Sequence, residues 1–209
     1  MRIFLLDVDN TIAPFQPTAE LYKSIFLRKR SLKYLAFGYF MIIMLKLFWF
    51  SSFVVEFQRK LIMSLLSKAD LSQLELESSR IAARVAESYN SGFKKVLSYY
   101  KQKNDKIYLL THCPDLIARK IVEMLGFDGE YSIEIKDYFK TRSDPVNIDK
   151  YKIIQKFKTD NPGAKTYYFA DDLIDIKCLL IADEGVLVNG SFFTKLICQL
   201  LFRKVKIWG

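Results

Sequence analysis

The first eleven residues constrain the fold of this chain most. The mostly apolar run over residues 1–6 is typical of a strand buried on both faces in the middle of a parallel sheet. It ends at Asp7-Val8-Asp9, and in an extended chain Asp7 and Asp9 share a side. Two neighbouring carboxylates at a buried strand end repel each other, and a cation removes much of that cost. Since open α/β sheets bind ligands at the carboxyl ends of their strands, the position indicates a ligand site, with an ordinary Asp/Asn turn as the alternative.

Composition indicates a folded domain with an anionic partner. The 209 residues are 51% hydrophobic and 15% aromatic, enough for a large core with an insertion. The net charge of +9 fits nucleic acid, an anionic membrane surface or a phosphorylated substrate. Cys113, Cys178 and Cys198 lack metal-binding spacing, which predicts free thiols in a reducing compartment. The N-terminal apolar run is too short for a signal peptide, so we expect a cytoplasmic location.

Residues 18–88 predict a helical module between the first two strands. Within and after it, helices are expected over 71–86 and 93–100, with a break at 90–92. The tyrosines and lysines near residue 100 are more typical of a solvated helix face than of a nucleic-acid patch, so nucleic acid is not the partner we expect.

An apolar stretch over 34–55 follows a basic cluster at 28–33. It is long enough to span a bilayer, but Lys46 would cost roughly 2.5–3.5 kcal/mol near its middle. A single crossing would also separate Asp7 from the acids near residue 171. We therefore predict an insertion that does not cross, either buried in the protein or laid on the inner face of a membrane with the basic cluster at the headgroups.

A second strand, over 106–110, ends at Thr111 and His112. A hydroxyl at a strand end, next to the start of a helix, suits an anionic oxygen. His112 is the only histidine, and a role in lining a turn is favoured over catalysis because no orienting partner is evident nearby.

A third strand is expected over 131–135, followed by a helix that starts at Asp149. Lys150 lies at this helix start, where the helix dipole disfavours a cation unless an anion balances it. This points to Lys150 as a phosphate contact, with Lys152 and Lys140 as rivals.

Further strands are expected over 166–170 and 185–189, and the tail over 192–208 is expected to close one edge of the sheet. The strand ending at Ala170 leads into Asp171 and Asp175, which can point at one spot. Hard cations such as Mg²⁺ take oxygen ligands and keep several waters, so one or two carboxylates suffice.

Four motifs in this order resemble the haloacid dehalogenase-like hydrolases across essentially the whole chain. The motifs are Asp7-Val8-Asp9-Asn10-Thr11, Thr111, Lys150 and Ala170-Asp171-Asp172-Leu173-Ile174-Asp175. Within that family, the stretch over 111–118, the pair Val188-Asn189 and Trp208 are similar to the phosphoserine phosphatase-like branch. The resemblance implies an α/β fold with a Rossmann-like parallel sheet core over 1–17 and 89–209, and a helical cap over 18–88 inserted after the first strand.

The resemblance also implies an Mg²⁺-dependent phosphatase. Asp7 would attack phosphorus and become an aspartyl-phosphate, while Asp9 protonates the leaving oxygen and then activates water. Thr111 and Lys150 would hold the phosphoryl oxygens. The implied metal ligands, direct or through water, are Asp7, the main-chain carbonyl of Asp9, Asp171 and Asp175.

Two residues depart from the family pattern. Asn10 replaces a usual glycine, and Asn tolerates turn conformations. Asp172 adds a charge beside the metal ligands. The apolar cap with its basic flank is similar to that of phosphatidylglycerophosphatase C, which implies a lipid-linked or amphiphilic phosphate. A small soluble phosphomonoester is the rival substrate, and a non-catalytic membrane-surface or nucleic-acid binding module is the competing class.

Overall fold

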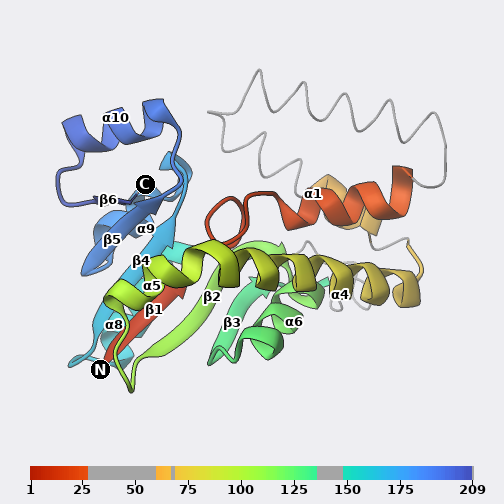
Figure 1. Ribbon diagram of the computed structural model, residues 1–209, viewed down its shortest axis with the longest axis horizontal. Coiled ribbons are helices and arrows are strands. Elements are labelled where there is room, and N and C mark those ends of the chain that lie inside the picture. The colour runs from red at the N-terminus through yellow and green to blue at the C-terminus, as the bar shows by residue number, and fades with distance from the viewer. Residues whose placement is uncertain (28–59, 67–68, 136–147, 209) are drawn as a thin grey trace.

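Six parallel strands form one sheet in the order β3-β2-β1-β4-β5-β6 in the computed structural model, which describes residues 1–27, 60–66, 69–135 and 148–208 (Figure 1). The strands are β1 (Arg2–Leu6), β2 (Lys106–Pro114), β3 (Gly129–Ile133), β4 (Lys165–Ala170), β5 (Glu184–Val188) and β6 (Lys206–Trp208). β1 lies between β2 and β4, as its unbroken apolar run predicts. The predicted α/β fold with a Rossmann-like parallel sheet is confirmed.

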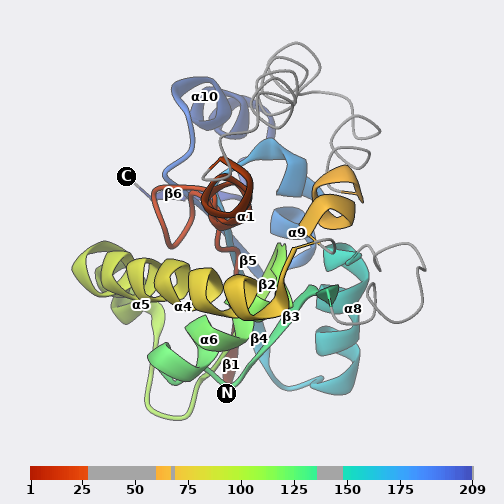
Figure 2. The same cartoon turned by 90° about the vertical axis from the view of Figure 1, so that its right-hand side faces the viewer.

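Helices cover both faces of the sheet (Figure 2). One layer holds α4 (Leu71–Ser88), α5 (Lys94–Tyr100) and α6 (Asp115–Leu125), and the other holds α8 (Lys150–Asp160), α9 (Ile176–Ile181) and α10 (Phe192–Leu201). The strand period of two divides β1 between the layers, because Phe4 and Leu6 pack on the first and Ile3 and Leu5 on the second.

The chain leaves β1 through a loop and enters α1 (Pro17–Tyr22), which continues as a π-helical segment, η1 (Lys23–Leu27). Pro17 occupies the first helical turn, where its missing N–H costs nothing. α1 runs beside α4 (Figure 1). Leu21 of α1 and Ile25 of η1 are fully buried. Residues 60–66 are also helical.

The helix break predicted at residues 90–92 is wrong. α4 continues through a π-helical turn, η2 (Tyr89–Phe93), directly into α5. The wider turn keeps both aromatic ends of η2 in the core, where Tyr89 meets Phe127 and Phe93 meets Phe169 at ring distances of 5.4 and 5.7 Å. Tertiary packing therefore overrides the local turn signal of Asn, Ser and Gly.

Two strand boundaries differ from prediction. The strand predicted over 106–110 continues to Pro114, with a register shift against β3 between Leu110 and Pro114. The third strand is β3 at Gly129–Ile133 rather than 131–135. In both cases pairing between strands, which local sequence does not reveal, sets the boundary.

Within the described ranges, every helix is too short or too polar to cross a bilayer. The apolar stretch over 34–55, its basic flank and Lys140 lie outside the described residues. The predictions made for them, and the division into core and cap, stay predictions.

Candidate active site

The candidate site lies where β1, β2 and β4 end. Leu6 pairs with Leu109 of β2 and Phe169 of β4, and the Asp7 N–H donates to the Phe169 carbonyl at 3.0 Å. Because all three strands are parallel, the residues that follow these pairs lie at one edge of the sheet. Asp7, Thr111 and Asp171 therefore share that edge.

Lys150 joins the two acidic motifs. Its Nζ lies 3.1 Å from Asp7 Oδ2 and 2.7 Å from Asp175 Oδ2. All three side chains are buried. The structure thus brings together one residue from each of three predicted motifs, which stand at positions 7, 150 and 175 of the chain.

The charges of this cluster shift one another's pKa values. Burial raises the pKa of Asp7, Asp175 raises it further, and Lys150 opposes the rise. Burial would lower the pKa of Lys150, but the carboxylates of Asp175 and Asp7 outweigh burial and raise that pKa above its ordinary value. Burial also opposes ionisation of Asp175, yet Lys150 holds its pKa below the usual range. Lys150 therefore stays protonated, and Asp175 stays ionised.

Tyr168 is a member of the cluster that the sequence did not reveal. Its hydroxyl donates to Asp175 Oδ2 at 2.6 Å and accepts from Lys150 Nζ at 3.1 Å. Burial and the nearby carboxylates of Asp175 and Asp7 raise the Tyr168 pKa well above its ordinary value, so the phenol keeps its proton. Strand periodicity could have indicated this residue, because it places position 168 on the face of the sheet that Lys150 approaches.

The loop after Asp7 is closely wound. The Val8 N–H donates to Asp7 Oδ1 at 2.9 Å, which orients the carboxylate. The N–H groups of residues 11, 12 and 13 all point to the Val8 carbonyl at 3.2–3.3 Å. Asn10 has a φ of +53°, the left-handed conformation that favours glycine and that Asn tolerates.

Asn189 braces this loop from the end of β5. Its Nδ2 donates to the carbonyls of Asn10 and Thr11 at 3.2 and 3.4 Å. The next residue is Gly190, where an added Cβ would lie 3.3 Å from the Asp171 carbonyl oxygen and 2.8 Å from Leu187. The β5–α10 connection therefore packs closely against both acidic motifs. The sequence predicted Asn189 as the last residue of a strand over 185–189, but β5 ends at Val188.

The remaining predicted groups lie near this edge. Asp9 is half-buried, and its charge is one cause of the raised pKa of Cys113, after burial. Thr111 is fully buried, and its Oγ1 accepts from the Cys113 N–H at 3.1 Å, which leaves the O–H proton to be donated. His112 lies in β2 with Nε2 3.3 Å from the Ile148 carbonyl oxygen, rather than in a turn.

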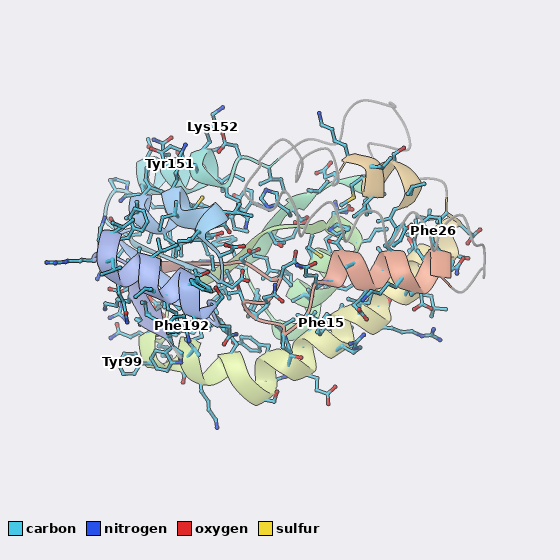
Figure 3. The ribbon with its side chains drawn as sticks, turned by 90° about the horizontal axis from the view of Figure 1, so that it is seen from above. Phe15, Phe26, Tyr99, Tyr151, Lys152 and Phe192 are labelled. Atoms are coloured by element: carbon cyan, nitrogen blue, oxygen red, sulfur yellow. The ribbon has the colours of Figure 1, made fainter. Side chains whose placement is uncertain are left out.

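Of the rival lysines, Lys152 points outward from α8 (Figure 3), with 79% of its side chain exposed and its Nζ 3.5 Å from Asp149. The side chain of Lys150 is 4% exposed. Lys140 lies outside the described residues. Lys150 is therefore the described lysine that meets the acidic motifs, and its phosphate-binding role stays a prediction.

The carboxylates at the edge fit a hard divalent cation. Burial, the charge of Asp7 and the charge of Asp172 raise the pKa of Asp171 to about 7, because these like charges crowd one another. Oxygen donors under such repulsion suit Mg²⁺. Over the described part of the chain, no three His, Cys, Asp or Glu side chains form a metal-binding group. The implied ligand set of Asp7, the main-chain carbonyl of Asp9, Asp171 and Asp175, direct or through water, therefore stays a prediction.

Residues 4–180 match the haloacid dehalogenase-like hydrolase family. The chain belongs to the haloacid dehalogenase-like hydrolases. The prediction of this family, and of an enzyme within it, is confirmed. No curated protein is similar enough in sequence to match this hydrolase.

Solved structures share the fold of this haloacid dehalogenase-like hydrolase at low identity. A protein of unknown function from Bordetella pertussis Tohama I has a TM-score of 0.69 and 12% identity, covering 100% of this chain and 98% of its own. Phosphoserine phosphatase in apo form has a TM-score of 0.59 and 14% identity, covering 99% and 92%. A phospho-aspartyl intermediate analogue of phosphoserine phosphatase has a TM-score of 0.53 and 13% identity, covering 99% and 91%.

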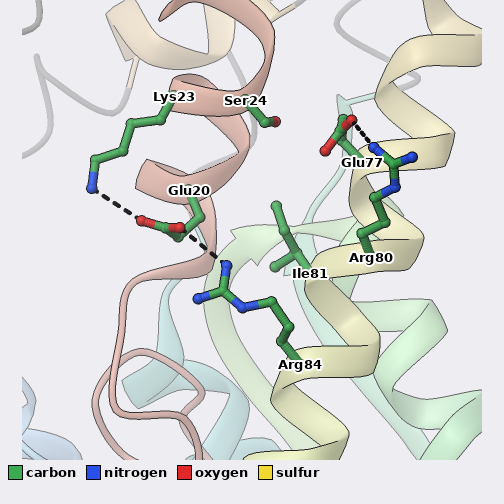
Figure 4. A pocket seen from close by; sticks show the side chains of 7 residues that line it. All are labelled: Glu20, Lys23, Ser24, Glu77, Arg80, Ile81 and Arg84. Carbon is green, nitrogen blue, oxygen red and sulfur yellow. Dashed lines mark hydrogen bonds and ion pairs between the residues drawn. The ribbon is translucent and has the colours of Figure 1, made fainter. Parts of the chain in front are cut away.

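The hydrolase also has a pocket of about 540 Å³ between α1 and α4 (Figure 4). Its lining residues are Glu20, Lys23, Ser24, Glu77, Arg80, Ile81 and Arg84. Glu20 pairs with Lys23 at 3.0 Å and with Arg84 at 3.1 Å. None of the predicted catalytic residues lines this pocket, so it is separate from the buried cluster around Lys150.

Proposed function

We propose that this hydrolase cleaves phosphomonoesters through an aspartyl-phosphate on Asp7, with Mg²⁺ as cofactor. The observation that carries the proposal is the position of Lys150, in contact with both Asp7 and Asp175 at the carboxyl edge of the sheet. A fixed cation beside a carboxylate nucleophile neutralises charge as a phosphoryl group approaches.

In the first step an Asp7 oxygen attacks phosphorus, the bond to the leaving oxygen breaks, and Asp9 gives that oxygen a proton. In the second step Asp9 takes a proton from water, the water oxygen attacks phosphorus, and the Asp7–phosphorus bond breaks, which releases phosphate. Thr111 and Lys150 hold phosphoryl oxygens by donating hydrogen bonds. Bound Mg²⁺ would neutralise the charge that gathers on the phosphoryl oxygens. Two steps through one carboxylate nucleophile let its neighbour act as acid and then as base.

For the substrate, we propose an amphiphilic or lipid-linked phosphate. Three large apolar side chains near this edge are more than half exposed: Ile174, between the two acids of the second motif, and Phe192 and Phe193, just after the β5–α10 connection. Apolar groups beside the catalytic edge suit a substrate with an apolar portion. The rival, a small soluble phosphomonoester, is supported by the fold shared with phosphoserine phosphatase.

We also propose a cytoplasmic location, at the inner face of a membrane. Cys113, Cys178 and Cys198 are all free and buried thiols, which suits a reducing compartment.

Hydrolysis of p-nitrophenyl phosphate tests the catalytic proposal. We expect turnover with Mg²⁺ that chelation abolishes, and a loss of at least about 10⁴-fold in Asp7→Asn, because a carboxamide is not a nucleophile. Asp160→Asn, at the end of α8, is the matched control and should keep full activity. Equal turnover of Asp7→Asn and the unaltered protein would reject Asp7 as the nucleophile. A panel of phosphorylated metabolites and phospholipids then separates the two substrate classes.

A further inference from the structure

Helix α10 presents an apolar face to solvent. Five large apolar residues are exposed along its ten positions: Phe192, Phe193, Leu196, Leu200 and Leu201. Phe192 is 75% exposed and Leu201 is 70% exposed. Figure 3 labels Phe192 beside the ribbon of α10. So many exposed large apolar side chains on one short helix mark an interaction surface.

The side of α10 that packs on the sheet is narrow. Only Thr194 and Cys198 are buried, one turn apart. At about 100° per residue, Phe192, Phe193, Leu196 and Leu200 fall within one arc of about 100° on a different side. The helix is thus amphipathic with its apolar side turned away from the core, the reverse of an ordinary surface helix.

This face adjoins the catalytic edge. Asn189, which braces the loop after Asp7, precedes Phe192 by three residues. Gly190 packs on the Asp171 carbonyl. Phe192 and Phe193 therefore begin the helix at the same edge of the sheet as the candidate active site.

The charged residues of α10 and of the segment that follows it are all basic. Residues 185–209 contain no Asp or Glu, while Lys195, Arg203, Lys204 and Lys206 lie on or just after α10. Lys206 pairs with Glu184, and Lys204 donates to the carbonyls of Leu180 and Ala182. Arg203 is exposed at the end of the helix. An apolar helix face with basic residues and no acidic ones is complementary to an anionic lipid surface, which offers an apolar layer beneath negative headgroups.

We propose that α10 docks on an anionic lipid bilayer, with Phe192, Phe193, Leu196 and Leu200 in the interfacial layer. Docked in this way, the helix would bring the carboxyl edge of the sheet near the lipid headgroups. The proposal concerns binding alone and does not depend on the phosphatase activity proposed above.

Flotation with vesicles tests this surface. The full chain is mixed at low salt with vesicles of phosphatidylglycerol and phosphatidylcholine in equal parts, or of phosphatidylcholine alone. The variants are Leu196→Gln with Leu200→Gln, and Phe192→Ser with Phe193→Ser. Met124→Gln is the matched control, because Met124 is 50% exposed on α6, in the other helix layer. Circular dichroism checks that each variant is folded. We expect all of them to fold, because the changed side chains are exposed.

We expect the unaltered chain to float with the anionic vesicles and less with neutral ones. Each α10 double variant should lose at least about tenfold in partition coefficient, which corresponds to about 1.4 kcal/mol, less than the burial of one leucine contributes. Met124→Gln should float as the unaltered chain does.

Three results would overturn the proposal. The unaltered chain stays in the soluble fraction at low salt. Alternatively, both α10 double variants float as well as the unaltered chain, which would assign binding to another segment such as residues 28–59. Finally, the chain forms a concentration-dependent dimer that the α10 variants abolish without any change in flotation, which would make a second copy the partner of this face.

Discussion

Two clusters of ion pairs in this molecule use similar side chains at similar distances but differ in burial. In the buried cluster, Lys150 lies 2.7 Å from Asp175 and 3.1 Å from Asp7. In the pocket between α1 and α4, Glu20 lies 3.0 Å from Lys23 and 3.1 Å from Arg84.

Because the distances are alike, we expect burial to decide what each ion pair contributes to stability. Water screens the pocket pairs, whose cationic side chains are about half exposed, and such pairs contribute about 0–1 kcal/mol. Water does not reach the buried cluster as freely, so removing one partner there leaves an uncompensated charge in the core.

The largest effect is expected from Lys150→Met. This change leaves Asp7 and Asp175 buried without their cation, so we expect the free energy of unfolding to fall by about 3–5 kcal/mol in urea titrations. Lys152→Met, two residues along the same helix at an exposed position, should change it by less than about 0.5 kcal/mol. Similar losses in both variants would show that the burial of the cluster does not matter.

A smaller effect is expected from Tyr168→Phe. The phenol donates a hydrogen bond to the ionised Asp175, and such bonds to charged groups contribute about 1.5–3 kcal/mol. Because Phe fills the same space, we expect the free energy of unfolding to fall by an amount near the lower end of that range, about 1.5 kcal/mol, in urea titrations. Tyr151→Phe is the control, since the Tyr151 hydroxyl is at the surface of α8 and accepts only a long hydrogen bond of 3.4 Å from Gln155. Full stability of Tyr168→Phe would contradict the strength assigned to this hydrogen bond.

The smallest effect is expected from Glu20→Gln in the pocket. The hydrogen bond from Lys23 lowers the Glu20 pKa, burial opposes the shift, and Arg84 adds to it. Because the folded-state pKa lies below the ordinary 4.5, this stabilisation is present above pH 4.5 and is lost as the pH falls through the lowered value. We expect the free energy of unfolding of Glu20→Gln to lie about 0.5 kcal/mol below that of the unaltered chain at pH 7. This difference should disappear in acid and in 1 M salt.

The control for this pH dependence is Glu75→Gln, an exposed substitution on α4. A Glu20→Gln difference that persists in acid would mean that the charge of Glu20 is not its source.

The sequence predicted the charged residues of the buried cluster but missed one of its members. Asp7, Lys150 and Asp175 follow from residue types at strand ends and a helix start, because those ends converge in a parallel sheet. Tyr168 did not follow, since strand periodicity gives a face but not which side chain of the neighbouring helix meets it.

The pocket between α1 and α4 could not be predicted at all. It depends on Glu20 and Arg84, 64 residues apart, lying side by side, and no local pattern encodes that separation. The π-helical turn and the extension of β2 were missed for a similar reason, because contacts distant in sequence decide them. For α10, the apolar residues were evident, but the choice of Thr194 and Cys198 as the packed side required the structure.

The continuous helix from Leu71 to Tyr100 has a mechanical consequence. With no flexible joint between α4 and α5, a tilt of α4 at the pocket would act as a lever on Tyr100 at the other end. Tyr100 packs at 5.5 Å against Phe169, one residue before the strand end that leads to Asp171. Occupancy of the pocket would then strain the edge of the sheet that carries Asp171, without any direct contact between the two.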